Sequence, residues 1–218
     1  MGYNVAIDGP AGAGKSTIAK LVAKKKGYIY VDTGAMYRGL AVHFLRKGIR
    51  PGETDKIAEA CEDAQVTIHY ENGVQQVYLN GDNITEKLRT EETGNMASFS
   101  SAVPAVREKL LELQRTLAAE HDVIMDGRDI GTNILPHADV KIYLTASVET
   151  RARRRFDELK EKGADCSYEQ IARDIEDRDY RDMHRDIAPL KQAEDAVLVD
   201  SSDMTIQEVV DRIAACCA

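Results

Sequence analysis

The chain has 218 residues, of which 43% are hydrophobic and 30% charged, and its formal net charge is −8 at pH 7. A chain of this length forms one domain carrying an insertion rather than two full domains, and its composition excludes disordered, collagen-like and fibrous proteins. The negative charge argues against broad binding to duplex nucleic acid, which needs Lys and Arg to neutralise phosphates.

The chain shows no pattern typical of export or membrane insertion. Its first residues lead directly into a strand-like run, and no 18 consecutive residues are apolar. The four cysteines lack C-x-x-C spacing, so neither a zinc site nor a disulfide framework is indicated. We therefore expect a cytoplasmic protein with reduced thiols and no membrane partner.

Five short apolar runs alternate with helical patterns, which predicts parallel strands joined through helices. The runs cover residues 4–7, 28–31, 122–125, 140–144 and 196–199. The fold class expected from them is α/β, with a five-stranded parallel sheet flanked by helices.

The first turn of the predicted sheet carries the strongest motif. Residues 9–16 read GPAGAGKS, which matches G-x-x-x-x-G-K-[ST] between a strand and a helix. Glycines let the chain wrap a phosphate so that successive N–H groups and the helix N-terminus point at it. Lys15 adds positive charge at the β and γ oxygens, and Ser16 can place its hydroxyl on Mg²⁺. The motif predicts a nucleoside triphosphate site, because a glycine-rich turn beside a core helix would give the lysine no role.

The helix after this motif is predicted from Lys15 to Gly27. Its inner face should hold Ile18, Leu21 and Val22. Gly27 supplies a left-handed cap at its C-terminus.

A second group of polar residues follows the second strand. The segment DTGAMYR at residues 32–38 brings Asp32, Tyr37 and Arg38 to the carboxyl end of that strand, where open α/β sheets bind ligands. Arg38 can fork a phosphate, and Tyr37 can face a sugar or a base. In the alternative, Asp32 only caps the next helix and Arg38 is solvated.

The middle of the chain departs from the α/β pattern. A helix capped by Thr54 should run to about Asp63. Alternating residues 66–70 and 74–79, each followed by an Asn-Gly turn, predict a small antiparallel insertion.

A third polar motif, DGRD at residues 126–129, ends the 122–125 strand. An apolar strand ending in Asp126 is similar to a Walker B element, whose carboxylate orients Mg²⁺ or its water. An ordinary β-turn can have the same composition. The motif therefore indicates a functional site mainly because residues 9–16 occur in the same chain.

The last third of the chain is rich in arginine. Pro104 should open a helix running to about residue 119, and Ser167 with Gln170 and Thr205 with Glu208 are typical of capping boxes. Arginines cluster within residues 151–155 and again at Arg173, Arg178, Arg181 and Arg185. A mobile arginine-rich segment suits phosphoryl transfer, which needs positive charge over the moving group; a solvated helix face is the alternative for the 151–155 cluster.

Five segments together resemble the bacterial cytidylate kinases, a family of P-loop nucleoside monophosphate kinases. They are GPAGAGKST, DTGAMYR, NMASFSSAVPAVR, DGRD and RDYRDMHRDIAPL, and they cover the chain in order. The resemblance implies a P-loop NTPase fold and a single kinase domain over residues 1–218. Within it, an acceptor-binding insert would cover about 63–90 and an arginine-rich lid about 150–185.

The resemblance implies transfer of the γ-phosphoryl group of ATP to CMP, and we expect dCMP as a further acceptor and Mg²⁺ as the cofactor. A chain of 24.1 kDa without an exposed apolar stripe is expected to be a monomer. ATP, with GTP as the alternative donor, would be held by the first segment, namely Gly9, Pro10, Ala11, Gly12, Ala13, Gly14, Lys15, Ser16 and Thr17. The metal would be held by Ser16. The residues implied to be catalytic are Lys15, Arg128, Asp129, Arg178 and Arg185.

The acceptor site is likewise implied by the resemblance. Asp32, Tyr37 and Arg38 would line it, Ser98 and Arg107 would read the cytosine edge, and Arg128 with Arg38 would take the acceptor phosphate. Arg178 and Asp182 would contact the sugar. Asp129, held by Arg185, would accept from the exocyclic amine. Discrimination against uracil independently requires such an acceptor, since a carboxylate facing a carbonyl is repelled.

Three other functions are alternatives to this one. A P-loop kinase for another small acceptor would differ in its response to a panel of acceptors. A GTPase switch needs an N-K-x-D string, which the sequence lacks. An RNA-binding role for the arginine-rich segment conflicts with the acidic total and with the lack of interleaved aromatic residues, so we expect nucleotide substrates and no nucleic-acid partner.

Overall fold

The computed structural model describes residues 2–218. By its contacts the chain divides into two compact units, described here in turn. We call residues 3–28 with 124–218 the terminal unit, and residues 29–123 the central unit.

Five strands form the main parallel sheet, in the order β2-β6-β1-β7-β8. The α/β fold class predicted from the sequence is confirmed. Each predicted strand is present with bounds moved by one or two residues: β1 Asn4–Asp8, β2 Ile29–Asp32, β6 Val123–Gly127, β7 Val140–Thr145 and β8 Val197–Asp200. Val5 and Ile7 of β1 are fully buried, and parallel strands covered on both faces give such continuous apolar runs.

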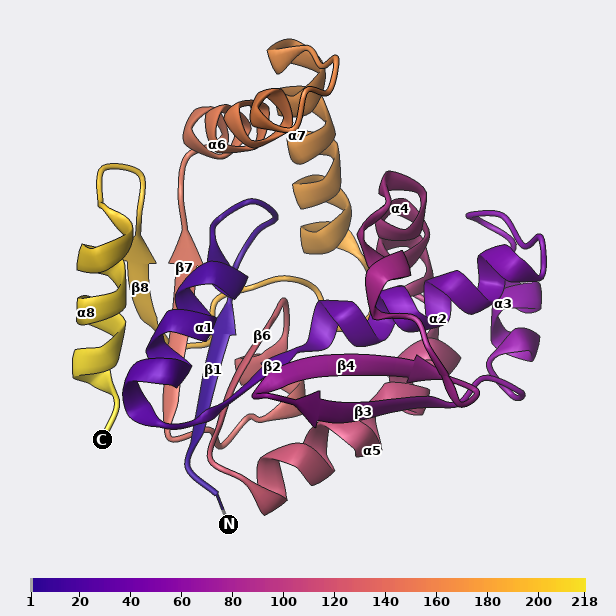
Figure 1. Ribbon diagram of the computed structural model, residues 1–218, viewed down its shortest axis with the longest axis horizontal. Coiled ribbons are helices and arrows are strands. Elements are labelled where there is room, and N and C mark those ends of the chain that lie inside the picture. The colour runs from indigo at the N-terminus through magenta and orange to yellow at the C-terminus, as the bar shows by residue number, and fades with distance from the viewer. Residues whose placement is uncertain (1) are drawn as a thin grey trace. The chain divides into compact units, whose positions relative to one another are not determined.

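The terminal unit surrounds its strands with four helices, α1 Lys15–Lys26, α6 Val148–Glu161, α7 Tyr168–His184 and α8 Ile206–Cys216. In register, Val5 of β1 pairs with Val140 of β7, and Ile142 of β7 pairs with Val197 of β8. Helices α1 and α8 lie side by side, and α6 packs against α7 (Figure 1).

The ends of these helices follow the predicted signals with two differences. Gly27 caps α1 at φ 75°, and Thr205 with Glu208 forms a capping box at α8. Ser167 caps α7, but the side chain of Gln170 donates to Asp174 instead of completing the box. The predicted inner face of α1 is correct for Ile18 and Val22 and wrong for Leu21, which is 41% exposed.

The central unit holds the predicted antiparallel insertion. Its strands β3 Val66–Glu71, β4 Val74–Leu79 and β5 Asp82–Asn83 form a separate sheet, and β3 and β4 make the long hairpin in Figure 1. Both Asn-Gly pairs adopt positive φ, as tight hairpin turns require.

The remaining elements of the central unit are helical: α2 Thr33–Arg46, α3 Thr54–Ala60, η1 Thr85–Arg89, α4 Glu91–Ser100 and α5 Pro104–Glu120. Pro104 opens α5 as predicted. Thr54 does not cap α3, because Glu53 occupies the cap position and Thr54 is already helical. The carboxylate of Glu53 closes the preceding turn by accepting from the N–H of Arg50 at 2.7 Å.

Among residues 2–218, no helix combines the length and the apolar character needed to cross a membrane.

Candidate active site

The glycine-rich turn between β1 and α1 has the backbone that its motif predicts. Gly9, Gly12 and Gly14 all have positive φ, and Gly14 precedes the first residue of α1. At Gly9 a Cβ would meet the carbonyl oxygen of Leu144 at 1.9 Å, so only glycine fits against β7. The turn therefore presents backbone N–H groups and a helix N-terminus, the arrangement that binds phosphates.

Lys15 is held above this turn. Its Nζ donates to the carbonyls of Gly9 and Pro10, each at 2.7 Å. The side chain is buried, and burial, together with the nearby Arg128 guanidinium, lowers the pKa of Lys15 well below its usual value, against the opposing effect of Asp126 and Asp8. A desolvated ammonium in this place gains most from an incoming anion.

Ser16 and Asp126 bring oxygen ligands together at the start of α1 and in β6. The Ser16 hydroxyl donates to Oδ2 of Asp126 at 2.8 Å. Asp126 is buried, and a hydroxyl with a carboxylate is a donor set that Mg²⁺ prefers when phosphate and water complete its shell. These two residues therefore fit Mg²⁺.

Asp8, the last residue of β1, is a site residue that the sequence interpretation missed. Its carboxylate accepts the backbone N–H groups of Ile130 and Gly131, each at 2.8 Å. Burial raises its pKa to about 6, with Asp129 adding to the rise, against the effect of the two hydrogen bonds and Lys15. Asp8 thus fixes the short η2 helix Ile130–Ile134, which begins beside Asp129.

Asp129 is a buried carboxylate that contacts the side chains of Arg185 and Asn133 in its own unit. Oδ1 lies 3.3 Å from Nη2 of Arg185, and Oδ2 accepts from Nδ2 of Asn133 at 3.1 Å. Arg185 itself is anchored through Nε and Nη2 to the carbonyl of Ala188, at 2.8 and 2.6 Å. The structure therefore brings Asp129 and Arg185 together, in the relationship that the resemblance implied.

Arg128 and Asp182 form a second pair in this cluster. Nε of Arg128 lies 2.8 Å from Oδ2 of Asp182. Burial opposes both charges, but the Asp182 carboxylate raises the pKa of Arg128, and the guanidinium lowers the pKa of Asp182. Arg178 lies on the same helix α7 and its charge also reaches Asp182 and Lys15.

Arg151, the first of the clustered arginines of α6, joins three separate segments of the terminal unit. It is buried, with Nη1 donating to the carbonyl of Ala11 at 2.8 Å, Nε to the carbonyl of Ala146 at 2.9 Å, and Nη2 lying 2.6 Å from Asp179. The side chain thereby links the glycine-rich turn, the end of β7 and helix α7.

The other arginines of α6 also contact protein groups. Arg153 lies over the rings of Phe156 and Tyr168, Arg154 donates to the carbonyl of Ser201, and Arg155 pairs with Glu158. Arg151 does not lie on a solvated face, because it is buried and its guanidinium has protein partners on three sides.

The central unit holds a further cluster at the end of β2. Oδ1 of Asp32 accepts the N–H of Ala35 at 2.8 Å, and its carboxylate lies 3.1 Å from Nη2 of Arg38. Asp32 therefore caps α2, as one sequence interpretation held, but Arg38 is paired rather than solvated. A Cβ at Gly34 would lie 2.9 Å from Nη1 of Arg38, so glycine makes room for the pair.

The remaining predicted residues of the central unit lie on α2, α4 and α5. The guanidinium of Arg107 lies 5.7 Å from the ring centroid of Tyr37, and its Nη1 donates to the carbonyl of Ser101 at 3.2 Å. The hydroxyl oxygen of Ser98 is buried and makes no hydrogen bond within the described residues. Tyr37 and Arg107 are thus brought together, and Ser98 keeps an unused polar group.

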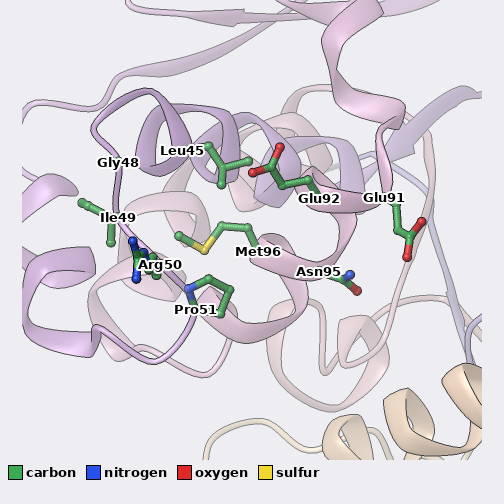
Figure 2. A pocket seen from close by; sticks show the side chains of 9 residues that line it. All are labelled: Leu45, Gly48, Ile49, Arg50, Pro51, Glu91, Glu92, Asn95 and Met96. Carbon is green, nitrogen blue, oxygen red and sulfur yellow. The ribbon is translucent and has the colours of Figure 1, made fainter.

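A pocket of about 690 Å³ lies elsewhere in the central unit. It is lined by Leu45, residues 48–51 and four residues of α4, and Met96 lies at the centre of these side chains in Figure 2. None of the sequence-predicted site residues lines it.

The chain matches the family model for cytidylate kinase over residues 5–218. It belongs to the cytidylate kinase family. It is 51% identical over 210 residues to the cytidylate kinase of Caldicellulosiruptor saccharolyticus, covering 96% of this chain and 93% of that protein. It is 45% identical over 210 residues to that of Bacillus subtilis, covering 96% and 94%.

Solved structures share the fold at low sequence identity. A gluconokinase from Sinorhizobium meliloti aligns with a TM-score of 0.50 at 12% identity, over 98% of this chain and 90% of that one. An uncharacterized protein from Eubacterium ventriosum aligns with a TM-score of 0.52 at 13% identity, over 99% and 97%. As a cytidylate kinase family member, the chain is a phosphotransferase enzyme with small-molecule nucleotide substrates, and the family's reaction is phosphoryl transfer from ATP to CMP.

Proposed function

We propose that the terminal unit binds ATP with Mg²⁺ through the glycine-rich turn, and that the acceptor is CMP or dCMP. The observation that carries the proposal is the buried carboxylate of Asp129 held by Arg185. A fixed hydrogen-bond acceptor selects an exocyclic amine and repels a carbonyl, which separates cytosine from uracil.

The donor nucleotide is assigned to residues 9–17. The positive φ of Gly9, Gly12 and Gly14 supports a phosphate cradle, and the desolvated Lys15 supports a charge at the β and γ oxygens. Ser16 and Asp126 would hold Mg²⁺, which when bound neutralises phosphate charge.

The acceptor nucleotide is assigned to its residues by the resemblance to the family. Arg38 and Arg128 would contact its phosphate, and Arg178 with Asp182 its sugar. Ser98 and Arg107 would read the base, which the unused Ser98 hydroxyl supports. Tyr37 would lie beside the nucleotide.

The proposed chemistry is a direct in-line transfer. A phosphate oxygen of CMP attacks the γ phosphorus, the bond to the β–γ bridging oxygen breaks, and ADP leaves with that electron pair. A phosphate oxygen is already anionic, so no strong general base is required. Lys15, Arg128 and Arg178 supply positive charge to the transferred group, and no covalent enzyme intermediate forms.

The proposal is tested by measuring ADP production with ATP and Mg²⁺ against CMP, dCMP, UMP, AMP and GMP in turn, with a reaction lacking acceptor as control. CMP and dCMP should exceed UMP by a wide margin, and the control should be silent. Slow ATP hydrolysis without any nucleotide acceptor would preserve the donor site and refute the acceptor assignment.

A further inference from the structure

Gln75, on β4 of the small antiparallel sheet, makes two hydrogen bonds to the backbone of a single site residue. Its Oε1 accepts the N–H of Asp32 at 2.9 Å, and its Nε2 donates to the carbonyl of Asp32 at 3.1 Å. β2 is the end strand of the five-stranded sheet. The side-chain amide thus pairs with the last residue of β2 as a neighbouring strand would.

A second side chain of the small sheet reaches the same strand. The hydroxyl of Tyr70 on β3 donates to the carbonyl of Tyr30 at 3.2 Å. Burial raises the pKa of Tyr70 to about 12, so the phenol remains a donor at neutral pH. Unlike Tyr70, Gln75 contacts Asp32, whose side chain pairs with Arg38 in the cluster at the end of β2.

From Asp32 the chain of contacts continues to a cationic side chain. The Asp32 carboxylate accepts the N–H of Ala35 and pairs with Nη2 of Arg38. Nε of Arg38 is buried and makes no hydrogen bond within residues 2–218. The direction of the guanidinium therefore depends on the place of Asp32, which Gln75 fixes through both backbone groups.

We infer that Gln75 is a positioning residue for the acceptor phosphate, acting through the backbone of Asp32 on the guanidinium of Arg38. The inference rests on the proposed function, in which Arg38 contacts the phosphate of CMP. It gives the small sheet a specific part in the reaction: one of its side chains sets the geometry of a phosphate-binding arginine. A polar side chain that only faced solvent would not bond both the N–H and the carbonyl of one residue, as the Gln75 amide does with Asp32.

The adjacent residue provides a matched control. The side chain of Gln76 interacts with exposed Asn83, accepting from its Nδ2 at 3.3 Å. Successive residues of a strand point to opposite faces, so the same substitution at Gln76 alters the sheet without touching Asp32.

The test compares Gln75→Leu with Gln76→Leu in steady-state assays that vary CMP and ATP separately. Gln75→Leu should lower kcat/KM for CMP by about tenfold or more, mainly through KM, because a misplaced guanidinium weakens phosphate binding. Its KM for ATP should stay within about twofold of the wild type. Gln76→Leu should match the wild type in both. An unchanged KM for CMP, or equal rises in both KM values, would overturn the inference.

A double-mutant cycle with Arg38→Met tests the route of the effect. If Gln75 acts through Arg38, adding Gln75→Leu to Arg38→Met should change kcat/KM for CMP by less than about twofold. Additive losses would refute the inference. If Gln75→Leu does not fold, Gln75→Asn, which is too short to reach both groups of Asp32, replaces it; failure of both to fold would assign Gln75 a structural role. Absence of CMP phosphorylation by the wild type would instead refute the proposed function.

Discussion

Arg128 at the end of β6 and Asp182 in the last turns of α7 form an ion pair of 2.8 Å, although 54 positions separate them in the chain. Their side chains are 19% and 6% exposed. The pair keeps a guanidinium assigned to the acceptor phosphate and a carboxylate assigned to the sugar in one arrangement within the terminal unit. Each charge stabilises the ionised form of the other, so removal of either side chain should also destabilise the ionised form of its partner.

Breaking this pair should destabilise the fold. Asp182→Ala leaves Arg128 largely buried without its counter-charge, and we expect a loss of about 3 kcal/mol in the free energy of unfolding. Arg128→Met combined with Asp182→Ala should recover part of that loss, because no unpaired charge remains. Urea denaturation of the two single variants and the double variant measures the coupling; additive losses would show that the pair contributes nothing.

Removal of the Lys15 charge should lower the activity of the enzyme without lowering its stability. Lys15→Met should lower kcat by about 10³-fold or more, since the ammonium contributes electrostatic stabilisation to the moving phosphoryl group. The melting temperature should stay equal or rise, because a desolvated charge is lost. Lys24→Met, on the exposed side of α1, is the matched control and should keep full activity. A Lys15→Met enzyme with wild-type kcat would refute the donor-site assignment.

Substitution of Asp129 should narrow base selectivity. Asp129→Ala removes the acceptor proposed for the cytosine amine, and the ratio of kcat/KM for CMP over UMP should fall by about tenfold or more, mainly through loss with CMP. Asp129→Asn can donate to a uracil carbonyl and should lower the ratio further. Competition of the two acceptors in one reaction measures the ratio directly. An unaltered ratio in both variants would remove Asp129 from base recognition.

Asp8 should make stability depend on pH in the acid range. Its pKa rises from 3.8 to about 6 on folding because it is buried, so the folded chain holds this proton more tightly than the unfolded chain. The stabilisation is complete below pH 3.8 and is lost as the pH rises through about 6. Relative to Asp8→Asn, the wild type should therefore lose about 3 kcal/mol of unfolding free energy between these limits.

Urea denaturation of both proteins across this range, without nucleotide or Mg²⁺, provides the measurement. Lys15 and Asp129, whose charges act on Asp8, are identical in the two proteins. A constant difference between wild type and Asp8→Asn at every pH would contradict the assigned shift.

The strands and the glycine-rich turn were accessible from sequence because their signals are local. Strands buried on both faces leave apolar runs, and the turn has a fixed spacing of glycines before Lys15. Leu21 was misplaced because it lies three residues after Ile18, where a helical period suggests the same face, yet it is 41% exposed. Periodicity does not report how far the covering elements extend.

The contacts that organise the candidate site were largely inaccessible. Asp8 resembles any acidic residue before a glycine turn, and its partners Ile130 and Gly131 are more than 120 positions away. Gln75 occupies an ordinary polar position of an alternating strand. The resemblance supplied Asp129 with Arg185, but residue types alone do not specify which distant carboxylate and guanidinium will pair.

Because the guanidinium of Arg151 binds three segments at once, the carbonyl of Ala11 is a position at which motion of α7 can be detected. That carbonyl shares one guanidinium with Asp179 of α7 and with Ala146. Any displacement of α7 must therefore either release Asp179 or transmit a change in hydrogen bonding to the middle of the glycine-rich turn. A ¹³C label on this single carbonyl would make motion of a distant helix visible in a chemical shift, without altering any side chain.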